Sequence, residues 1–128
     1  MNSMFSGCGG DNFETLNLGN NFDTSKVTDM TNMFGDFGGQ KFEVLNLGSK
    51  FNTRSVKNMS GMFNSMPELK TIISPSFDTT SAINTSSMFI NDTKLVGGAG
   101  TTYDTSHINI EYARIDGGPS SPGYFTAP

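Results

Sequence analysis

The first candidates for covalent or acid–base catalysis in this sequence are His107 and Cys8, each the only residue of its type. A histidine can act as a general base and a cysteine as a nucleophile. His107 precedes Ile108 in an expected turn, however, and no convincing set of serine, histidine and aspartate forms around it. We therefore expect a surface turn residue at His107, and the sequence predicts no catalytic residue and no enzyme activity.

Carboxylates recur at Asp23, Asp78 and Asp104, and a column of this kind is one way to bind calcium between stacked segments. Asn52 interrupts the series, and the Thr and Ser residues beside each member favour turn capping by the side chain. The glycine-rich residues 97–100 lack the lysine and hydroxyl pair of a phosphate-binding loop. We expect no metal site and no cofactor, and calcium between the aspartates is the open alternative.

Composition and charge exclude several classes of function. Twelve acidic and eight basic residues give a net charge of -4 without long charged runs, so we expect no nucleic-acid partner. No apolar run approaches the roughly 18 residues of a membrane span, and the N-terminal segment lacks a secretion signal, so we expect no membrane insertion. The single Cys8 excludes an intrachain disulfide framework and a thiolate zinc site. Its position recurs as Phe37 and Met66, which predicts a small buried side chain there.

Internal repeats are the strongest signal in the sequence. The dipeptide Met-Phe recurs at intervals of 29, 29 and 26 residues, beginning at Met4, Met33, Met62 and Met88. A second marker, an aromatic residue followed by Asp or Asn and then Thr, keeps the same register at 22–24, 51–53, 77–79 and 103–105. Columns that stay in register along a chain are typical of a solenoid, in which each unit buries its apolar face against its neighbours.

The pattern within one unit predicts its parts. Leu16 and Leu18 alternate with polar residues, as in a short strand with one buried face. Stacked copies of this strand would pair about 4.8 Å apart and align their leucines in a narrow core. Met30, Met33 and Phe34 are spaced three and four apart, which predicts one or two helical or 3₁₀ turns. The sequence therefore predicts a repeat solenoid of parallel β coils with short helical turns, in about four units of 26–29 residues.

Three segments carry a family resemblance: residues 22–34 (Phe-Asp-Thr-Ser-Lys-Val-Thr-Asp-Met-Thr-Asn-Met-Phe), 59–63 (Met-Ser-Gly-Met-Phe) and 4–8 (Met-Phe-Ser-Gly-Cys). They resemble the BspA-like leucine-rich repeat family, the bacterial surface protein 26-residue repeat, and the likeness extends to about residue 116. The resemblance implies leucine-rich-repeat-like coils on surface or secreted proteins that bind proteins and adhere to cells. This sequence departs from the pattern by about three extra residues in each of its first two units, and it keeps the family's usual cysteine only at Cys8.

The two ends of the repeat array differ. Met1 falls in a methionine column, so the solenoid, residues 1–106, starts in mid-repeat and we expect a missing upstream portion. The uncovered Met4, Phe5 and Leu16 would form an apolar edge that needs a cap or a partner, and self-association is one way to cover it. At the other end we expect residues 107–128 to form a C-terminal capping segment, with Tyr124 and Phe125 folded back over the last coil.

Without a catalytic centre, binding is the expected function. The residues that alternate with the core leucines should form an exposed sheet surface for a partner, comprising Glu14, Thr15, Asn17, Glu43, Val44, Asn46, Lys70, Thr71 and Ile73. Val44 and Ile73 favour an interaction site over a merely solvated face, because they place apolar side chains inside a polar stripe.

With the resemblance, this surface predicts a non-catalytic protein-binding or adhesion module of a bacterial surface or secreted protein, located outside the cell or on its surface. Its partner would be a protein or a glycan, since a face rich in threonine and asparagine suits both. Two alternatives stay open at this stage. One is a free-standing small intracellular inhibitor that binds and blocks a partner enzyme, and the other is a structural spacer.

Overall fold

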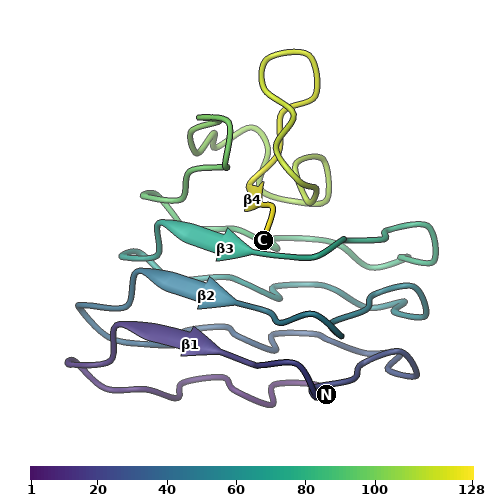
Figure 1. Ribbon diagram of the computed structural model, residues 1–128, viewed down its shortest axis with the longest axis horizontal. Helices are drawn as coiled ribbons and strands as arrows, with labels where there is room; N and C mark the ends of the chain where they lie inside the picture. Colours follow the sequence, from purple (N-terminus) through teal and green to yellow (C-terminus); the bar gives the residue numbers. More distant parts are fainter.

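The protein is a stack of flat coils (Figure 1), described by a computed structural model that covers residues 1–128. Each of the first three coils contributes one short strand: β1 (Thr15–Asn17), β2 (Val44–Asn46) and β3 (Thr71–Ile73). A fourth strand, β4 (Phe125–Thr126), completes one parallel sheet in the order β1-β2-β3-β4. The predicted parallel β solenoid is confirmed.

The strand register places equivalent residues of successive coils above one another. Leu16 pairs with Leu45, and Leu45 pairs with Ile72. Leu45 and Ile72 are fully buried, whereas Leu16 in the first coil is only partly buried. The strands are short because each unit supplies only a few alternating residues before a turn, and their stability comes from stacking on neighbouring coils.

The Met-Phe dipeptides form the other wall of the core. Their phenyl rings stack nearly parallel from coil to coil: Phe5 lies 5.5 Å from Phe34, Phe34 lies 5.8 Å from Phe63, and Phe63 lies 5.5 Å from Phe89. The rings of Phe34, Phe63 and Phe89 have no exposed surface. Offset aromatic pairs add a modest stabilisation to their large buried area, so this column is a principal part of the core.

The helical turns expected around the methionines are absent, and that expectation was wrong. The segments are tight turns in which backbone N–H groups alternate between two acceptors: Met33 donates to Met30 three residues back, whereas Phe34 donates to Met62 in the next coil. The alternation follows from left-handed residues, such as Asn32 with φ of 52° and Asp36 with φ of 55°, which stop a helix from propagating. Positive φ recurs at the same positions of the other coils: Ser3, Gly61 and Ser87, then Gly7, Ser65 and Asn91.

The threonine of the second marker bridges neighbouring coils. The hydroxyl of Thr24 is buried, donates to the carbonyl of Asn52 at 2.7 Å and accepts from the Asn52 N–H at 2.7 Å. Thr53 makes the same pair of bonds with Asp78 one coil further on. A buried hydroxyl that is satisfied in both roles is not costly, which explains why threonine recurs here inside the stack.

The C-terminal end of the sheet is closed by the chain's own tail. Residues 97–100 leave the stack as a loop, and Phe125 of β4 pairs with Ile72 of β3 in the place where a fourth repeat strand would lie. The side chains of Tyr124 and Phe125 are fully buried. The tail therefore supplies both the edge strand and the apolar residues that cover the last coil.

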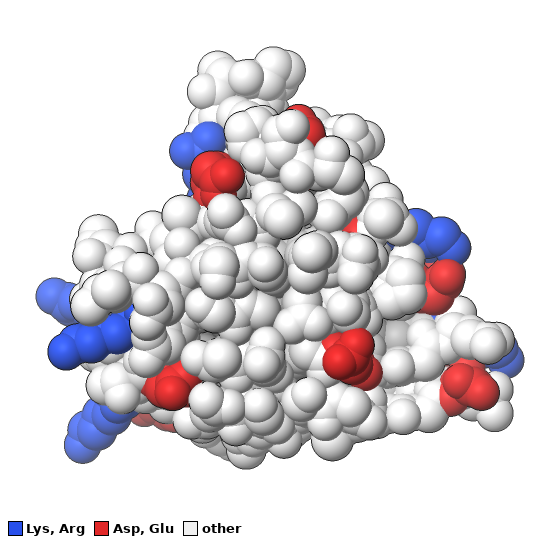
Figure 2. Space-filling view, turned by 180° about the vertical axis from the view of Figure 1, so that it is seen from behind, with Lys and Arg blue, Asp and Glu red and all other residues white.

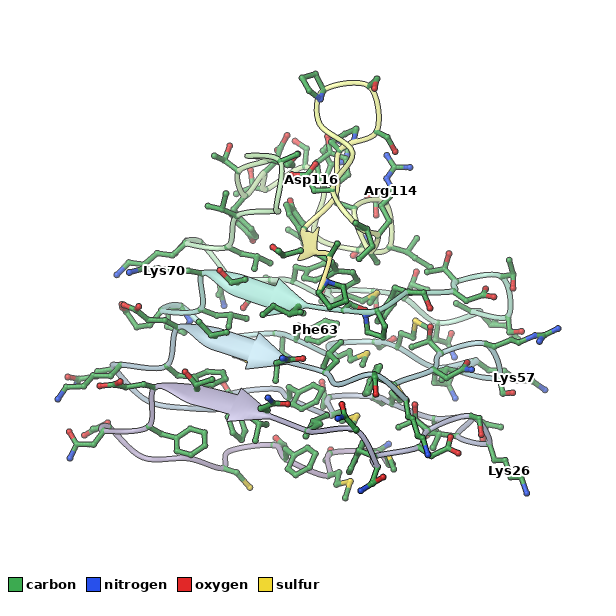
Figure 3. The ribbon with its side chains drawn as sticks, in the orientation of Figure 1. Lys26, Lys57, Phe63, Lys70, Arg114 and Asp116 are labelled. Carbon is green, nitrogen blue, oxygen red and sulfur yellow. The ribbon has the colours of Figure 1, made fainter.

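Asp116 ties this tail to the loop (Figure 3). Its two carboxylate oxygens accept hydrogen bonds from Ala99 N–H at 2.9 Å, from Thr101 N–H at 2.9 Å and hydroxyl at 2.7 Å, and from Gly118 N–H at 3.0 Å. Desolvation favours the neutral carboxyl, but these bonds together outweigh it and lower the pKa of Asp116 to about 2. Asp116 is therefore ionised at neutral pH and acts as the polar hub of this end.

The N-terminal end has no comparable cover. Met4 is 48% exposed and Phe13 is 37% exposed, although Met33 and Phe42, their equivalents in the second coil, are buried. Cys8 is exposed as well, so the expectation of a buried thiol was wrong. Phe37 and Met66 in its column are buried because a coil packs on either side of them, whereas the first coil has a neighbour on one side only.

Asp92 occupies the fourth position of the Cys8 column and is fully buried. One carboxyl oxygen accepts the Met66 N–H at 2.8 Å, and the other has no partner. Burial raises the pKa of Asp92 well above its usual range. Because the folded state then holds this proton more tightly than the unfolded state does, the contribution to stability is greatest below the unfolded pKa of about 3.9 and falls as the pH rises toward the folded pKa.

The Asp92→Asn variant is expected to be more stable than the parent chain at neutral pH, by about 1 to 3 kcal/mol, because it keeps an acceptor for Met66 without a buried ionisable group. The difference should shrink as the pH is lowered toward about 4, where both side chains are neutral. Urea unfolding of both proteins over this pH range measures it. A difference that stays constant with pH would contradict the assignment of a raised pKa.

Candidate binding face

The nine residues expected to bind a partner lie together on one face of the sheet, as the strand register requires. Thr15, Val44 and Thr71 form one row across the strands, and Asn17, Asn46 and Ile73 form a second row two residues further along. Glu14, Glu43 and Lys70 form a third row directly before the strands, joined by backbone bonds from Glu43 to Glu14 and from Lys70 to Glu43. The predicted residues are thus neighbours in space.

Within the strands, the outward side chains are more exposed in the first coil than in the second and third. Thr15 and Asn17 are exposed, whereas Val44, Asn46 and Ile73 are each partly buried by their neighbours. Val44 and Ile73 still present apolar surface among polar side chains. Partly buried apolar groups in a polar surround are characteristic of surfaces that lose water on binding.

The asparagines of this face are held in fixed orientations. The side-chain carbonyl of Asn17 accepts the Gly19 N–H at 2.8 Å, and that of Asn46 accepts the Gly48 N–H at 3.0 Å. Each bond uses the amide oxygen and leaves the amide N–H₂ group free to donate outward. Pre-oriented donors lower the entropic cost of binding a carbonyl or hydroxyl group.

Three shallow hollows open on this face, and all nine predicted residues line them. Glu14, Thr15, Glu43 and Val44 line the first, of about 320 Å³. Asn17, Asn46 and Ile73 line the second, of about 250 Å³, and Lys70 and Thr71 line the third, of about 570 Å³. The predicted residues therefore border concave surface as well as flat sheet.

The hollows also contain residues that the repeat pattern did not single out. Pro75 and Pro128 form an apolar wall of the second hollow, and Tyr103 lines the third. Ser49 in the second hollow lies in a column with Asn20, to which its hydroxyl donates at 3.1 Å, so the repeat spacing was a usable signal for this pair. Pro128 comes from the folded-back tail, and no repeat spacing could have placed it here.

The charges on this face are partly paired. Lys70 and Glu43 form a salt bridge of 2.8 Å in which both side chains are half exposed. Such a surface pair adds little stability, so either partner is available to a ligand at small cost. On the opposite face of the molecule the Lys and Arg side chains lie toward the edges of the view (Figure 2).

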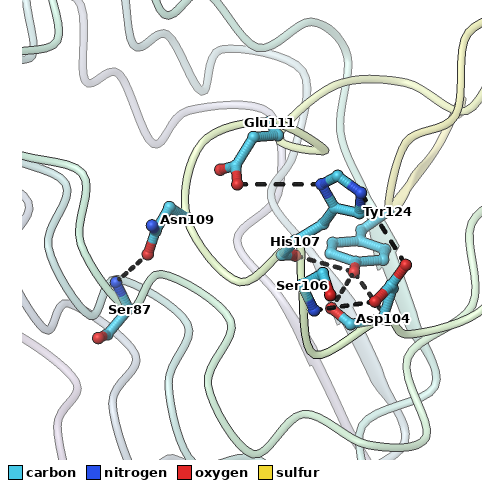
Figure 4. Close-up of polar contacts among 7 residues, drawn as sticks. All are labelled: Ser87, Asp104, Ser106, His107, Asn109, Glu111 and Tyr124. Carbon is cyan, nitrogen blue, oxygen red and sulfur yellow. Dashed lines mark hydrogen bonds and ion pairs between the residues drawn. The ribbon is translucent and has the colours of Figure 1, made fainter.

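His107, the one histidine, lies beside carboxylates at the other side of the last coil (Figure 4). Its two ring nitrogens are each 3.9 Å from a carboxylate oxygen, one of Asp104 and one of Glu111, and its ring stacks on Tyr112 with centroids 4.2 Å apart. No hydroxyl of the chain donates a hydrogen bond to either nitrogen. The arrangement is a partly exposed cluster of polar and aromatic contacts.

Tyr124 connects this cluster to the tail. Its hydroxyl accepts the Asp104 N–H at 3.0 Å and donates to the His107 carbonyl at 2.9 Å (Figure 4). Burial raises the pKa of Tyr124 to about 12, so its hydroxyl keeps its proton at neutral pH. The Tyr124 hydroxyl thereby links the C-terminal tail to the last copy of the second marker, residues 103–105.

The aspartates of the column at Asp23, Asp78 and Asp104 each cap the turn in which they lie. Asp23, Asp78 and Asp104 each accept the N–H two residues further on, at 2.8 to 2.9 Å, and Asn52 does the same toward Arg54 at 2.8 Å. The Thr80 hydroxyl also donates to Asp78. These side-chain bonds are Asx turns, so the same geometry explains why asparagine can replace aspartate in the column.

No group of three or more His, Cys, Asp or Glu residues has an arrangement that could hold a metal ion. The structure also contains no helix of the length and apolar character needed to cross a membrane.

Comparison with known proteins places the repeats in a family. The family model described as "Mycoplasma protein of unknown function, DUF285" matches residues 1–116, which include all of β1, β2 and β3. No curated protein and no solved structure matches the chain. On the strength of the family match, the chain belongs to the DUF285 family of Mycoplasma proteins of unknown function.

Proposed function

We propose that this protein is a non-catalytic binding module of the BspA-like leucine-rich repeat type, which attaches a bacterial surface or secreted protein to a protein partner. The single observation that carries the proposal is the face of β1, β2 and β3, on which Val44 and Ile73 stand among fixed polar groups and beside three hollows. A side of the solenoid that served only as a solvated wall would have no need of apolar side chains there.

The repeat motif supports the finer family assignment and the location. Residues 22–34 and 59–63 carry the marker sequence of the BspA-like repeats within the part of the chain that the family model matches. Members of that repeat family are found on surface and secreted proteins. This likeness supports the proposal that the protein acts outside the cell or on its surface.

The rigidity of the face supports protein binding as its use. Inter-coil backbone bonds fix the strands, and side-chain bonds fix Asn17 and Asn46. A partner that meets this surface pays little to order it. The apolar side chains of Val44 and Ile73 would then supply the area that is removed from water at the centre of the contact.

The experiment measures binding of the purified chain to immobilised extracellular-matrix glycoproteins, before and after enzymatic removal of their glycans. We expect saturable binding that survives glycan removal and that the Ile73→Arg variant weakens at least about tenfold, because a charge replaces apolar contact area. The matched control is Ile83→Arg, since Ile83 is 74% exposed and lies outside the face.

The Val44→Arg variant gives a second test on a different strand, in case the Ile73 variant is unstable to heat. Absence of binding to every glycoprotein, or unchanged binding by both variants on the face, would overturn the proposal. Binding that is lost with the glycans would assign the face to carbohydrate in place of protein.

A further inference from the structure

We propose that an apolar pocket beside the candidate face receives one aromatic side chain of the protein partner, together with a basic residue next to it. The pocket has a volume of about 200 Å³ and lies between the second and third coils, where the chain approaches β2 and β3. The inference rests on the proposed function for the identity of the partner as a protein.

A change in coil length creates the pocket. The first two coils carry about three extra residues each, around Gly10 and Gly39, and the third coil carries none. The two lower coils therefore reach further to the left than the third coil (Figure 1). The pocket lies in the resulting step, between the projecting loop of the second coil and the shorter turn of the third.

The projecting loops are packed tightly against each other. A Cβ atom on Gly39 would lie 2.7 Å from the Cα of Asp11, and one on Gly9 would lie 2.9 Å from the Cα of Gly38. The N–H of Gly38 also donates to the Cys8 carbonyl at 2.7 Å. Backbones this close leave little room for movement, so the wall of the pocket is preformed and costs little to order on binding.

The floor of the pocket consists of core side chains. Phe37, Phe42, Met66 and Leu69 line it, and each has at most 5% of its surface exposed. The rings of Phe37 and Phe42 meet edge to face with centroids 4.8 Å apart, and the Met66 N–H donates to the buried Asp92 at 2.8 Å. A rigid apolar pocket of this kind is where a single inserted side chain contributes most to binding.

The size and lining of the pocket favour an aromatic side chain. An apolar cavity of about 150 Å³ is enough to hold benzene, so a volume of about 200 Å³ admits a phenyl group. The two phenyl rings and the Met66 thioether also make favourable contacts with an aromatic ring, in addition to the area they bury. Phenylalanine therefore suits this pocket better than a small aliphatic residue.

The rim of the pocket is acidic. Asp11 and Glu68 line it, and no lysine or arginine does. Glu68 is paired with Lys94, whereas Asp11 is exposed and has no ionic partner in the chain. A basic residue beside the inserted ring would meet this free carboxylate. Gln40 lines both this pocket and the first hollow of the candidate face, so a partner on the face reaches the pocket directly.

Methionine-methyl NMR of the full chain, titrated with the blocked dipeptide acetyl-Phe-Arg-amide, tests the pocket directly. We expect the Met66 resonance to shift saturably under the ring current of the bound phenyl group. The resonance of Met88, which is buried and does not line the pocket, should stay in place. Acetyl-Ala-Arg-amide should leave Met66 unmoved, and acetyl-Phe-Glu-amide should bind at least about threefold more weakly because its charge is repelled.

The Asp11→Lys variant tests the rim in the same titration. The Asp11 side chain is exposed and unpaired, so the variant should fold. We expect the dissociation constant of acetyl-Phe-Arg-amide to rise at least about threefold, because attraction becomes repulsion. The matched control Glu111→Lys makes the same change of charge at an exposed residue of the C-terminal segment and should leave the constant unchanged.

The outcomes separate this inference from the proposed function. No Met66 shift, an equal shift with the alanine dipeptide, or an unchanged constant in Asp11→Lys would overturn the assignment of the pocket, even if Ile73→Arg weakens glycoprotein binding as expected. A saturable Met66 shift in a chain that binds no glycoprotein would keep the assignment of the pocket and overturn the proposed function.

Discussion

Replacement of Phe125 by alanine is expected to lower the free energy of unfolding by about 3 to 5 kcal/mol, close to the limit that a domain of this size tolerates. Phe125 is fully buried, pairs with Ile72 and lies 4.7 Å from the ring of Phe77 and 5.7 Å from that of Phe63. Its loss removes apolar contacts from the end of the core and leaves a cavity that the two-residue strand β4 is too short to close. Urea unfolding followed by circular dichroism measures the change.

Phe13→Ala is the matched control for this prediction. Phe13 has the same side chain and contacts two phenylalanine rings, where Phe125 contacts three, but it is 37% exposed on the first coil. We expect a loss of only about 1 to 2 kcal/mol, in proportion to its smaller buried area. Equal losses at Phe13 and Phe125 would mean that the tail does not close the core as described.

Replacement of Gly48 by alanine is expected to cost more than about 3 kcal/mol or to prevent folding. Gly48 has φ of 81°, and a Cβ atom there would lie 2.0 Å from the carbonyl oxygen of Gly19 in the coil below. The clash is with backbone, so no side-chain movement relieves it. The two coils would have to separate, and the hydrogen bonds between them would weaken along the strand.

The neighbouring coil supplies a control with the same residue and the same backbone conformation. Gly19 has φ of 73°, but a Cβ atom there meets nothing within 4 Å. Gly19→Ala should therefore cost only the strain of a left-handed alanine, about 1 to 2 kcal/mol. Thermal and urea unfolding of the two variants compare the values, and similar losses at both positions would contradict the close stacking of the coils.

The apolar columns of the solenoid are covered at one end of the described structure and not at the other. The last coil is covered by Tyr124 and Phe125, with Asp116 holding the loop and tail in place. The first coil has the same apolar columns without such cover.

Much of the fold and the residues of the candidate face could be predicted from the sequence, because each unit repeats the same pattern of apolar and polar residues. The columns of Leu16 and Leu45 required parallel strands in register, since only stacking of like on like buries them together. Once the register is known, the alternation of side chains assigns Thr15 and Asn17 to the outer face. The predicted binding residues were therefore placed side by side by the repeat itself.

Only the tertiary structure reveals the features that the repeat pattern does not encode. The spacing of Met30, Met33 and Phe34 suits a helix and a stacked turn equally well, and the bonds to the next coil select the turn. Cys8 is exposed because burial in its column requires a coil on both sides. The pairing of Phe125 with Ile72 occurs once and joins distant parts of the chain, so no second copy of it existed in the sequence to reveal it. Local patterns that repeat determine the coil, whereas the ends of the stack depend on single long-range contacts.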